Sequence, residues 1–245
     1  MRQLALDTET TGMNREGGEV SLGHRIIEIG AVELIKREIT SNNYHVYLNP
    51  EQEVDPEAEQ VHGFSWQDLK DKPLFMEVAD GFISFIQGAE LIIHNASFDL
   101  SFLNHELSLL NQQLGQQKYG RIEDYCSVID TLEVAKHKHP GMRNNLDALC
   151  KRYSVDNTGR ELHGALLDSE LLAEVYLALT GGQAKLGLGS EEEASQASGQ
   201  YDPLTSRRLV SPEVASQLML LAANDAELAA HQAKLGELTN ALWLK

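Results

Sequence analysis

The sequence predicts an α/β protein: a mixed sheet of about five strands flanked by helices, followed by a flexible linker and a helical C-terminal segment. Two observations support this fold class. Runs of strand-forming residues come first, and later strands alternate with segments of helical periodicity. The chain has 245 residues, 42% of them hydrophobic, and is therefore long enough to bury a full core. At about 150 residues per domain, this length corresponds to between one and two domains.

The strands are expected from short runs of apolar and β-branched residues. Two of these runs are the buried segments Leu91-Ile92-Ile93 and Val128-Ile129. The others cover residues 4–8, 26–35 and 44–48, and a loop containing four glycines joins the first two of them.

The helices are expected from their start signals and apolar stripes. Asp55 and Pro56 are the residue types preferred at an N-cap and at the first helical position, and Asp130 is a second expected N-cap. A stripe after Pro73 indicates an amphipathic helix. That stripe comprises Phe75, Val78, Phe82, Phe85 and Ile86, and further helices are expected over residues 97–110, 131–136, 145–153 and 164–180.

The composition changes at Gly181-Gly182. Residues 183–206 are rich in Gly, Ser and Gln and include three consecutive glutamates, which is typical of a flexible linker. Beyond them, Asn224 is the expected N-cap of a helix from Asp225 to about Leu238. A tail of about 40 residues cannot build its own core. We therefore expect a folded domain over residues 1–182, a linker over 183–206, and a segment over 207–245 that folds on a partner.

The charge balance restricts how the protein can handle nucleic acid. Acidic residues outnumber basic ones by 37 to 20, giving a formal net charge of −17. A domain that grips nucleic acid by itself normally carries a surplus of Lys and Arg. Nucleic-acid chemistry here must therefore use metal ions to screen phosphate, or depend on a basic partner.

The cellular setting is expected to be the cytoplasm, without membrane association. Cys126 and Cys150 are too few for a disulfide framework and are interpreted as core thiols in a reducing compartment. No stretch approaches the roughly 18 apolar residues of a membrane span, and the N-terminus has no apolar signal core.

Four carboxylates lie where carboxylates are costly to bury. Asp7 and Glu9 are two apart at the end of the first strand, so both project from one face of the sheet. Asp99 is in the first turn of a helix after a buried strand, and Asp168 is on an otherwise apolar helix. Such a group needs a neutralising cation, and oxygen ligands select Mg²⁺ or Mn²⁺. Two such ions about 4 Å apart form the clamp used in phosphodiester hydrolysis.

Each acidic cluster, taken alone, has an ordinary explanation. Asp7 and Glu9 would be a solvated turn, Asp99 a first-turn acid favoured by the helix dipole, and Asp168 an exposed helical residue. The three clusters together, in this order, are much harder to explain in that way.

The joint pattern is similar to that of a known family. It comprises Leu6-Asp7-Thr8-Glu9-Thr10-Thr11-Gly12, His94-Asn95-Ala96-Ser97-Phe98-Asp99 and His163-Gly164-Ala165-Leu166-Leu167-Asp168. It resembles the DEDD exonucleases of ribonuclease H-like fold, in the branch with a histidine five residues before the last aspartate. Within that branch the chain resembles the proofreading subunits of bacterial replicative DNA polymerases, including at residues 146–150, 229–231 and 242–243.

The resemblance implies a role for each matching residue. Asp7, Glu9 and Asp168 would be direct ligands of two divalent ions, Mg²⁺ or Mn²⁺, and would also touch the substrate. Asp99 would hold the second ion. His163 would be the general base, consistent with an imidazole that titrates near neutrality. Glu57 and His62 would contact the 3′-terminal nucleotide.

The activity implied for residues 1–182 is 3′→5′ exonuclease action on mispaired deoxynucleotides at a primer end, releasing nucleoside monophosphates. One alternative is a free-standing exoribonuclease or RNA-trimming enzyme, since four carboxylates do not report on a 2′-hydroxyl. Another is a mainly structural scaffold of the polymerase. The linker and the tail argue against the first, and the intact motifs argue against the second.

The resemblance also implies partners for the C-terminal part. The stretch Gln183 to Leu188 resembles a short sliding-clamp motif, with Gln183, Leu186 and Leu188 as its contact residues. An ordinary linker with two unpartnered leucines is the alternative. The catalytic subunit of the polymerase is expected to bind Leu228, Leu235, Leu238 and Trp243. The sequence leaves open whether a small accessory subunit also binds the exonuclease domain.

Overall fold

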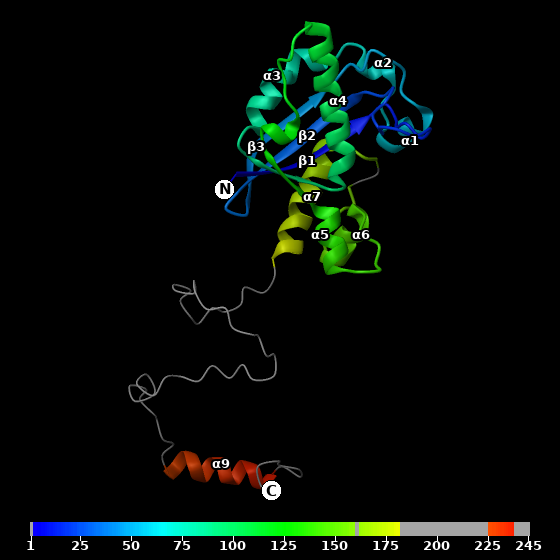
Figure 1. Ribbon diagram of the computed structural model, residues 1–245. Coiled ribbons are helices and arrows are strands. Elements are labelled where there is room, and N and C mark those ends of the chain that lie inside the picture. Colours follow the sequence, from blue (N-terminus) through cyan, green and yellow to red (C-terminus); the bar gives the residue numbers. More distant parts are fainter. Residues whose placement is uncertain (1, 160–161, 182–224, 238–245) are drawn as a thin grey trace. The chain divides into compact units, whose positions relative to one another are not determined.

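The computed structural model describes residues 2–159, 162–181 and 225–237 (Figure 1). The chain divides into two units, residues 1–187 and 188–245, and each is treated by itself. The division falls inside the segment whose composition predicts a linker.

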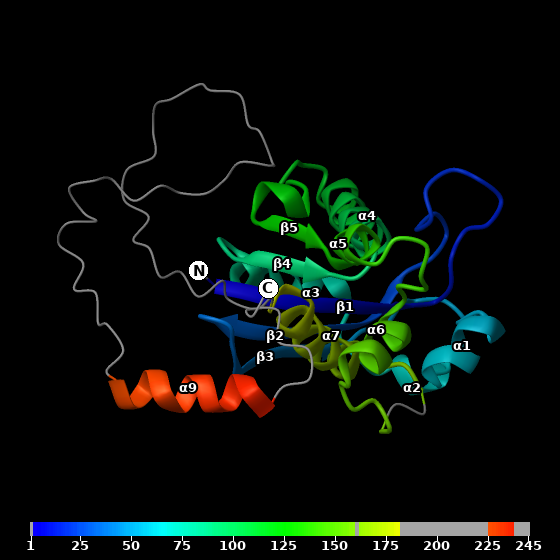
Figure 2. The ribbon, with the colours of Figure 1, turned by 90° about the horizontal axis from the view of Figure 1, so that it is seen from below.

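The first unit is built on one mixed sheet with the strand order β3-β2-β1-β4-β5 (Figure 2). β1 pairs antiparallel with β2, which pairs antiparallel with β3, whereas β4 is parallel to β1 and β5 is parallel to β4. The predicted α/β class with about five strands is confirmed. The strands are β1 (Arg2–Thr10), β2 (Ile26–Ile35), β3 (Glu38–Tyr47), β4 (Glu90–Ile93) and β5 (Ser127–Asp130).

Helices cover both faces of the sheet. One core cluster joins the sheet to α3 and α4, and a second joins the opposite face to α5, α6 and α7. The helices of this unit are α1 (Pro56–His62), α2 (Trp66–Leu69), α3 (Phe75–Ile86), α4 (Ala96–Leu114), the 3₁₀ turn η1 (Ile122–Asp124), α5 (Thr131–Lys138), α6 (Leu146–Tyr153) and α7 (Ala165–Thr180).

The alternation along β1 decides which helix each side chain meets. Leu4 and Leu6 belong to the core under α3 and α4, whereas Ala5 belongs to the core under α7. Because side chains alternate along a strand, Asp7 and Glu9 continue the α7 face and Thr8 continues the α4 face. The end of β1 thus places polar side chains on both faces of the sheet, under α4 on one side and under α7 on the other.

Several element boundaries differ from the sequence prediction. The third strand was expected at residues 44–48, but β3 begins at Glu38 because it forms a hairpin with β2, turning through Lys36 and Arg37 at positive φ. Its polar first half has little strand propensity, and pairing with β2 overrides it. The helix expected at 97–110 begins at Ala96 and continues to Leu114. The short α2 and η1 were not expected.

Two predicted N-cap positions are confirmed, whereas the N-cap expected at Asn224 lies outside the described residues. Asp55 is the N-cap of α1, with Pro56 at its first position. The Asp130 side chain caps α5 by accepting a hydrogen bond from the Leu132 backbone at 2.9 Å. Cys126 and Cys150 are both buried, as expected of core cysteines. Among the described residues, no helix combines the length and apolar character needed to cross a membrane.

In the second unit the described residues form one helix, α9 (Asp225–Glu237), close to the predicted span. Leu228 on this helix is 49% exposed. The side chain of Leu235, and all of Gln183, Leu186, Leu188, Leu238 and Trp243, lie outside what the structure describes. Their proposed partner contacts therefore stay predictions.

Candidate functional site

Five of the sequence-predicted residues line one pocket of about 290 Å³ at the ends of β1 and β4; we call it the acidic pocket. They come from four elements: β1, the first turn of α4, the segment before α7, and α7 itself. The residues are Asp7, Glu9, Asp99, His163 and Asp168, and the pocket is completed by Thr8, His94, Asn95, Phe98, Asn145, Leu146 and Asp147.

A glycine on β2 brings α7 close to the acidic residues of β1. Gly30 lies directly opposite Asp7, and a Cβ at Gly30 would clash with the backbone of Ala165. The Ser169 hydroxyl donates a hydrogen bond to the Gly30 carbonyl at 2.9 Å, which fixes this close approach. Asp168, in the first turn of α7, is consequently buried beside β1 at 2% exposure.

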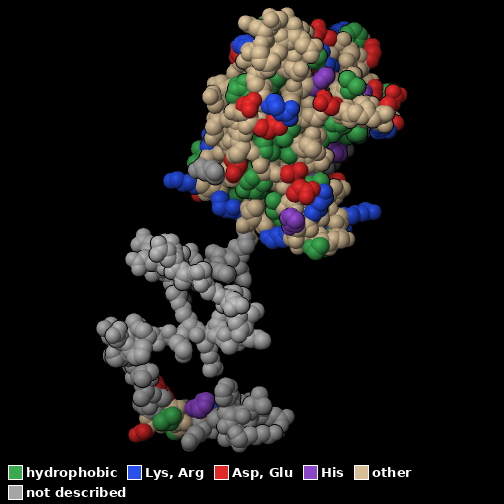
Figure 3. All heavy atoms as spheres, viewed as in Figure 1, with side chains coloured by type: hydrophobic (Ala, Val, Ile, Leu, Met, Phe, Trp, Pro, Cys, Tyr) green, Lys and Arg blue, Asp and Glu red, His purple; other side chains and the backbone are tan. Residues whose placement is uncertain are grey.

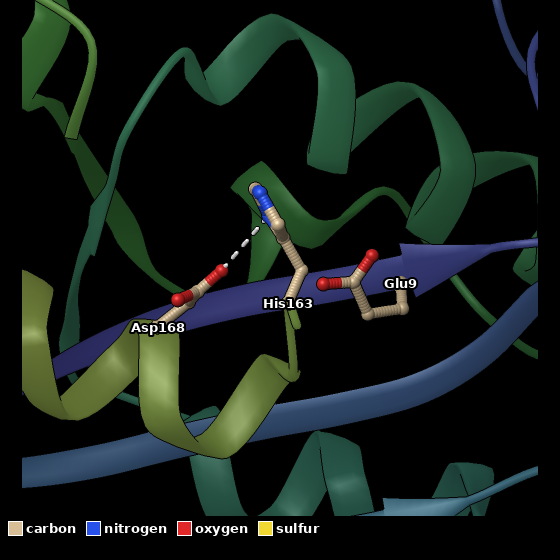
Figure 4. A group of neighbouring side chains, drawn as sticks. All are labelled: Glu9, His163 and Asp168. Atoms are coloured by element: carbon tan, nitrogen blue, oxygen red, sulfur yellow. Dashed lines mark ion pairs between the residues drawn. The ribbon is translucent and has the colours of Figure 1, made fainter. Parts of the chain in front are cut away.

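Glu9, His163 and Asp168 point toward one another (Figure 4). One ligand atom from each lies within 4.8 Å of those of the other two, and His163 Nδ1 is 3.3 Å from Asp168 Oδ2. The His163 backbone N–H donates to the Val61 carbonyl at 3.0 Å, which joins this residue to α1. The imidazole is 44% exposed, so solvent reaches it from one side while the two carboxylates stay buried.

Asp99 is a buried acid of the pocket, with 3% of its surface exposed. Burial raises its pKa to about 7, opposed by the hydrogen bond that its Oδ1 accepts from the Thr8 hydroxyl at 2.7 Å. A carboxylate held in such surroundings gains from a nearby cation, which would offset the cost of burying its charge. Four convergent carboxylates, three of them buried, are the donor set that hard divalent cations prefer, so these residues fit a metal centre.

A second, larger pocket of about 630 Å³ adjoins the first; we call it the adjacent pocket. Thr8, Glu9 and Phe98 line both pockets, so the two share a wall. Glu57 and His62, the two residues expected at the 3′-terminal nucleotide, line the adjacent pocket and not the acidic one.

The surroundings of His62 disfavour its protonation. Its Nδ1 accepts a hydrogen bond from the Phe64 backbone at 3.1 Å, and its buried Nε2 has no hydrogen-bond partner among the described residues. Burial lowers the pKa of His62, the Thr10 backbone opposes this shift, and His163 lowers it further. A neutral imidazole with an unused nitrogen suits a hydrogen bond to a sugar or a base.

Some residues of the two pockets were not selected from the sequence. Arg15 lines the adjacent pocket and forms an exposed ion pair with Glu57 at 2.6 Å, and His24 and Asp55 also line this pocket. In the acidic pocket, Asp147 and His94 complete the wall, although the sequence alone indicates no role for either side chain.

A family model described as "Exonuclease" matches residues 4–176. This range covers every residue of the acidic pocket and ends inside α7.

The chain is also similar to curated proteins over nearly its whole length. It is 52% identical to DNA polymerase III subunit epsilon of Escherichia coli (strain K12), over 96% of this chain and 92% of that protein. The identity to the same subunit of Salmonella typhimurium (strain LT2) is 50%, with the same coverage. Among solved structures, exonuclease X in complex with 5′ overhanging duplex DNA matches with a TM-score of 0.53 and 24% identity, over 72% of this chain and 90% of that one. This structural likeness supports the exonuclease fold.

Proposed function

Because the chain belongs to the exonuclease family, and within it to the DNA polymerase III epsilon subunits, we propose that it removes mispaired nucleotides from a primer 3′ end. The reaction is hydrolysis of the last phosphodiester bond, releasing a nucleoside monophosphate. It proceeds in the 3′→5′ direction and uses two divalent cations, Mg²⁺ or Mn²⁺. The setting is replication in the bacterial cytoplasm.

One observation carries this proposal: Asp7, Glu9, Asp99, His163 and Asp168 converge on a pocket that shares a wall with a second one large enough for a nucleotide. A nucleotide in the adjacent pocket would present its 5′ phosphate toward Glu9, at the shared wall. The bond to be cut would then lie against the acidic pocket.

The protein side chains divide the work between them. Asp7, Glu9, Asp99 and Asp168 would hold the cations, which supply positive charge to offset the charge that develops on the phosphate. His163 would accept a proton from the attacking water through its imidazole. Its 44% exposure gives water a route to that nitrogen and gives the proton a route to solvent.

The adjacent pocket would bind the terminal nucleotide without reading its base. His62 offers its Nε2, Phe98 offers an aromatic ring, and Glu57 lies at the exposed side in its ion pair with Arg15. A frayed, mispaired end reaches such a pocket at lower cost than a paired end, so selectivity arises from unpairing.

The acidic composition fits an exonuclease that is delivered by a partner. On the face seen in Figure 3, acidic and basic side chains are interspersed over the folded domain, and no broad basic surface covers it. We propose that the C-terminal segment tethers the domain to the polymerase, and that a sliding clamp and a small accessory subunit bind as well. Tethering supplies a high effective concentration, so the domain needs little DNA affinity of its own.

The tether is tested with a fragment of residues 1–182. The acidic pocket is complete by Asp168 and α7 ends at Thr180, so we expect the fragment to digest short single-stranded DNA as the full chain does. It should lose binding to the polymerase subunit in a pull-down, and proofreading should return when excess fragment is added. Equal polymerase binding by fragment and full chain would show that the tail is not the tether.

The enzymatic proposal is tested by digestion of primers with matched or mismatched 3′ ends, made of DNA or RNA, in Mg²⁺, Mn²⁺ or EDTA. We expect mismatched DNA ends to be shortened fastest, one nucleoside monophosphate at a time, with no reaction in EDTA. Asp168→Asn is the matched control because it preserves the size of the side chain. Faster digestion of RNA would favour the RNA-trimming alternative, and metal-independent digestion would contradict the mechanism.

A further inference from the structure

A buried carboxylate on β2, outside the acidic pocket, contacts the element that carries two of its residues. Glu28 is 1% exposed, and its Oε2 accepts a hydrogen bond from the Ala165 backbone N–H at 3.1 Å. Ala165 is the first residue of α7, and it lies between His163 and Asp168 in the sequence.

The start of α7 needs such an acceptor. The first N–H groups of a helix have no partner within the helix, and the N-cap here is Gly164, which has no side chain to supply one. The carboxylate of Glu28, on β2, supplies the missing acceptor, and its Oε2 also faces Gly164. A negative charge at a helix N-terminus is favourable as well.

Glu28 is itself held in place from β3. His45 Nε2 lies 2.7 Å from Glu28 Oε1, so each carboxylate oxygen has a separate partner. His45 in turn contacts the Tyr47 ring, with ring centroids 4.9 Å apart. The chain of contacts therefore runs from the edge strand β3 through β2 to the first turn of α7.

The strand register places these contacts beside the acidic residues of β1. Glu28 is directly opposite Glu9, and Gly30 is directly opposite Asp7. In an antiparallel pair, opposite residues share a face of the sheet, so Glu28 lies on the face that α7 covers. Glu28 and Gly30 thus act on the same helical turn, one by a hydrogen bond and the other by the space it leaves.

We propose that Glu28 is a positioning residue for the exonuclease reaction, held by His45, which fixes His163 and Asp168 relative to Glu9 through the N-terminus of α7. The inference rests on the proposed function. It requires no contact between Glu28 and the substrate. A loosened first turn would let the imidazole and the Asp168 carboxylate drift from the geometry that the reaction needs, and small displacements of this kind are costly in rate.

The test compares Glu28→Ala with Glu28→Gln in the full chain. The alanine variant loses both hydrogen bonds, and we expect kcat to fall by about 10–100-fold while KM changes by less than about threefold. In the glutamine variant the amide oxygen still accepts the Ala165 N–H and the amide NH₂ donates to His45. It should therefore recover kcat to within about threefold of the parent, as expected when the hydrogen bonds rather than the charge position the helix.

Glu33 provides a matched control on the same strand. It is 5% exposed, forms an ion pair with Arg2 at 2.6 Å, and accepts hydrogen bonds from Thr40 and Asn42 of β3, but it lies outside both pockets. Glu33→Ala should lower the melting temperature and leave kcat unchanged at temperatures where the protein is folded. If Glu28→Ala does not fold, His45→Ala is used in its place. That variant keeps Glu28 and removes only the hydrogen bond between Glu28 and His45.

Hydrogen exchange of the peptide over residues 163–172 gives a readout that is independent of activity. We expect faster exchange there in Glu28→Ala than in Glu33→Ala, and parent-like exchange in Glu28→Gln. The positioning role is overturned if Glu28→Ala lowers kcat no more than Glu33→Ala, or if exchange at the start of α7 is unchanged. A parent chain without exonuclease activity would instead refute the proposed function, and the exchange data would still decide the positioning role.

Discussion

The acidic pocket and the adjacent pocket share Thr8, Glu9 and Phe98, but most of their other residues come from different structural elements. The acidic pocket draws its four proposed cation ligands from β1, α4 and α7, and three of them, Glu9, Asp99 and Asp168, are buried. The adjacent pocket draws on a glycine-containing loop and the short α1, and its Arg15–Glu57 ion pair is largely exposed. Strands and helices thus hold the four carboxylates proposed for cation binding, whereas a loop and a short helix hold most of the groups proposed for substrate contact.

This difference separates two kinds of kinetic effect. Changes in the acidic pocket should act on kcat, since they alter the groups at the reacting phosphate. Changes in the adjacent pocket should act mainly on KM, because they alter contacts that substrate and transition state share. Substitutions in each pocket therefore test that separation.

The largest effect is expected from Asp168→Asn. Removing one buried carboxylate from the proposed metal centre should lower kcat by at least about 10³-fold. The melting temperature without metal should stay the same or rise, because a cluster of buried carboxylates repels itself. Single-turnover digestion and thermal unfolding measure the two quantities. Activity within tenfold of the parent would show that Asp168 does not hold a catalytic cation.

His163→Ala should come next, with kcat lowered by about 10²–10³-fold and Mn²⁺ binding retained. Single-turnover digestion and Mn²⁺ titrations, both at one fixed pH, provide the comparison. A kcat within about threefold of the parent would contradict the role of general base.

Asp99 should affect stability in a pH-dependent way. Its pKa of about 7 in the folded protein lies above the ordinary value, so between about pH 4 and 7 the folded state keeps a proton that the unfolded chain releases. The contribution of this group to the free energy of unfolding is therefore greatest at low pH and is lost as pH rises toward 7. In EDTA, the free energy of unfolding of the parent should fall by on the order of 1–3 kcal/mol between pH 4 and pH 7 because of this group. Asp99→Asn should not show this fall, as measured by urea unfolding.

A difference between Asp99→Asn and the parent that stays constant from pH 4 to pH 7 would show that Asp99 does not titrate in this range. Glu33→Gln serves as the opposite control. The ion pair with Arg2 lowers the pKa of Glu33, outweighing its burial, so its stabilising contribution is present at neutral pH and is lost as the solution becomes acidic.

The smallest effect is expected in the adjacent pocket. His62→Ala should raise KM by about tenfold and change kcat by less than about threefold, since it removes a contact with the bound nucleotide. Steady-state digestion of single-stranded DNA measures both constants. A fall in kcat comparable to that of His163→Ala would erase the distinction between the pockets, and it would place His62 among the residues that act on the reacting phosphate.

The sequence predicts much of this architecture because its signals are local. A cap such as Asp130, a stripe such as that of α3, and the acids at the end of β1 are all recognisable within a few residues. Residues that act through strand register are not. Nothing local marks Gly30 or Glu28, whose importance comes from lying opposite Asp7 and Glu9 and beneath α7. The early start of β3 was missed for the same reason, since pairing with β2 decides it.

A crystal structure of the full chain with Mn²⁺ and a nucleoside monophosphate would show whether the two pockets divide cation binding and nucleotide binding as proposed. We predict the sugar and base in the adjacent pocket beside His62 and Phe98, with the phosphate at Glu9 and with Mn²⁺ held by Asp7, Glu9, Asp99 and Asp168. Anomalous scattering identifies the ions independently of the nucleotide. Mn²⁺ bound away from these four carboxylates, or a nucleotide bound outside the adjacent pocket, would contradict the account.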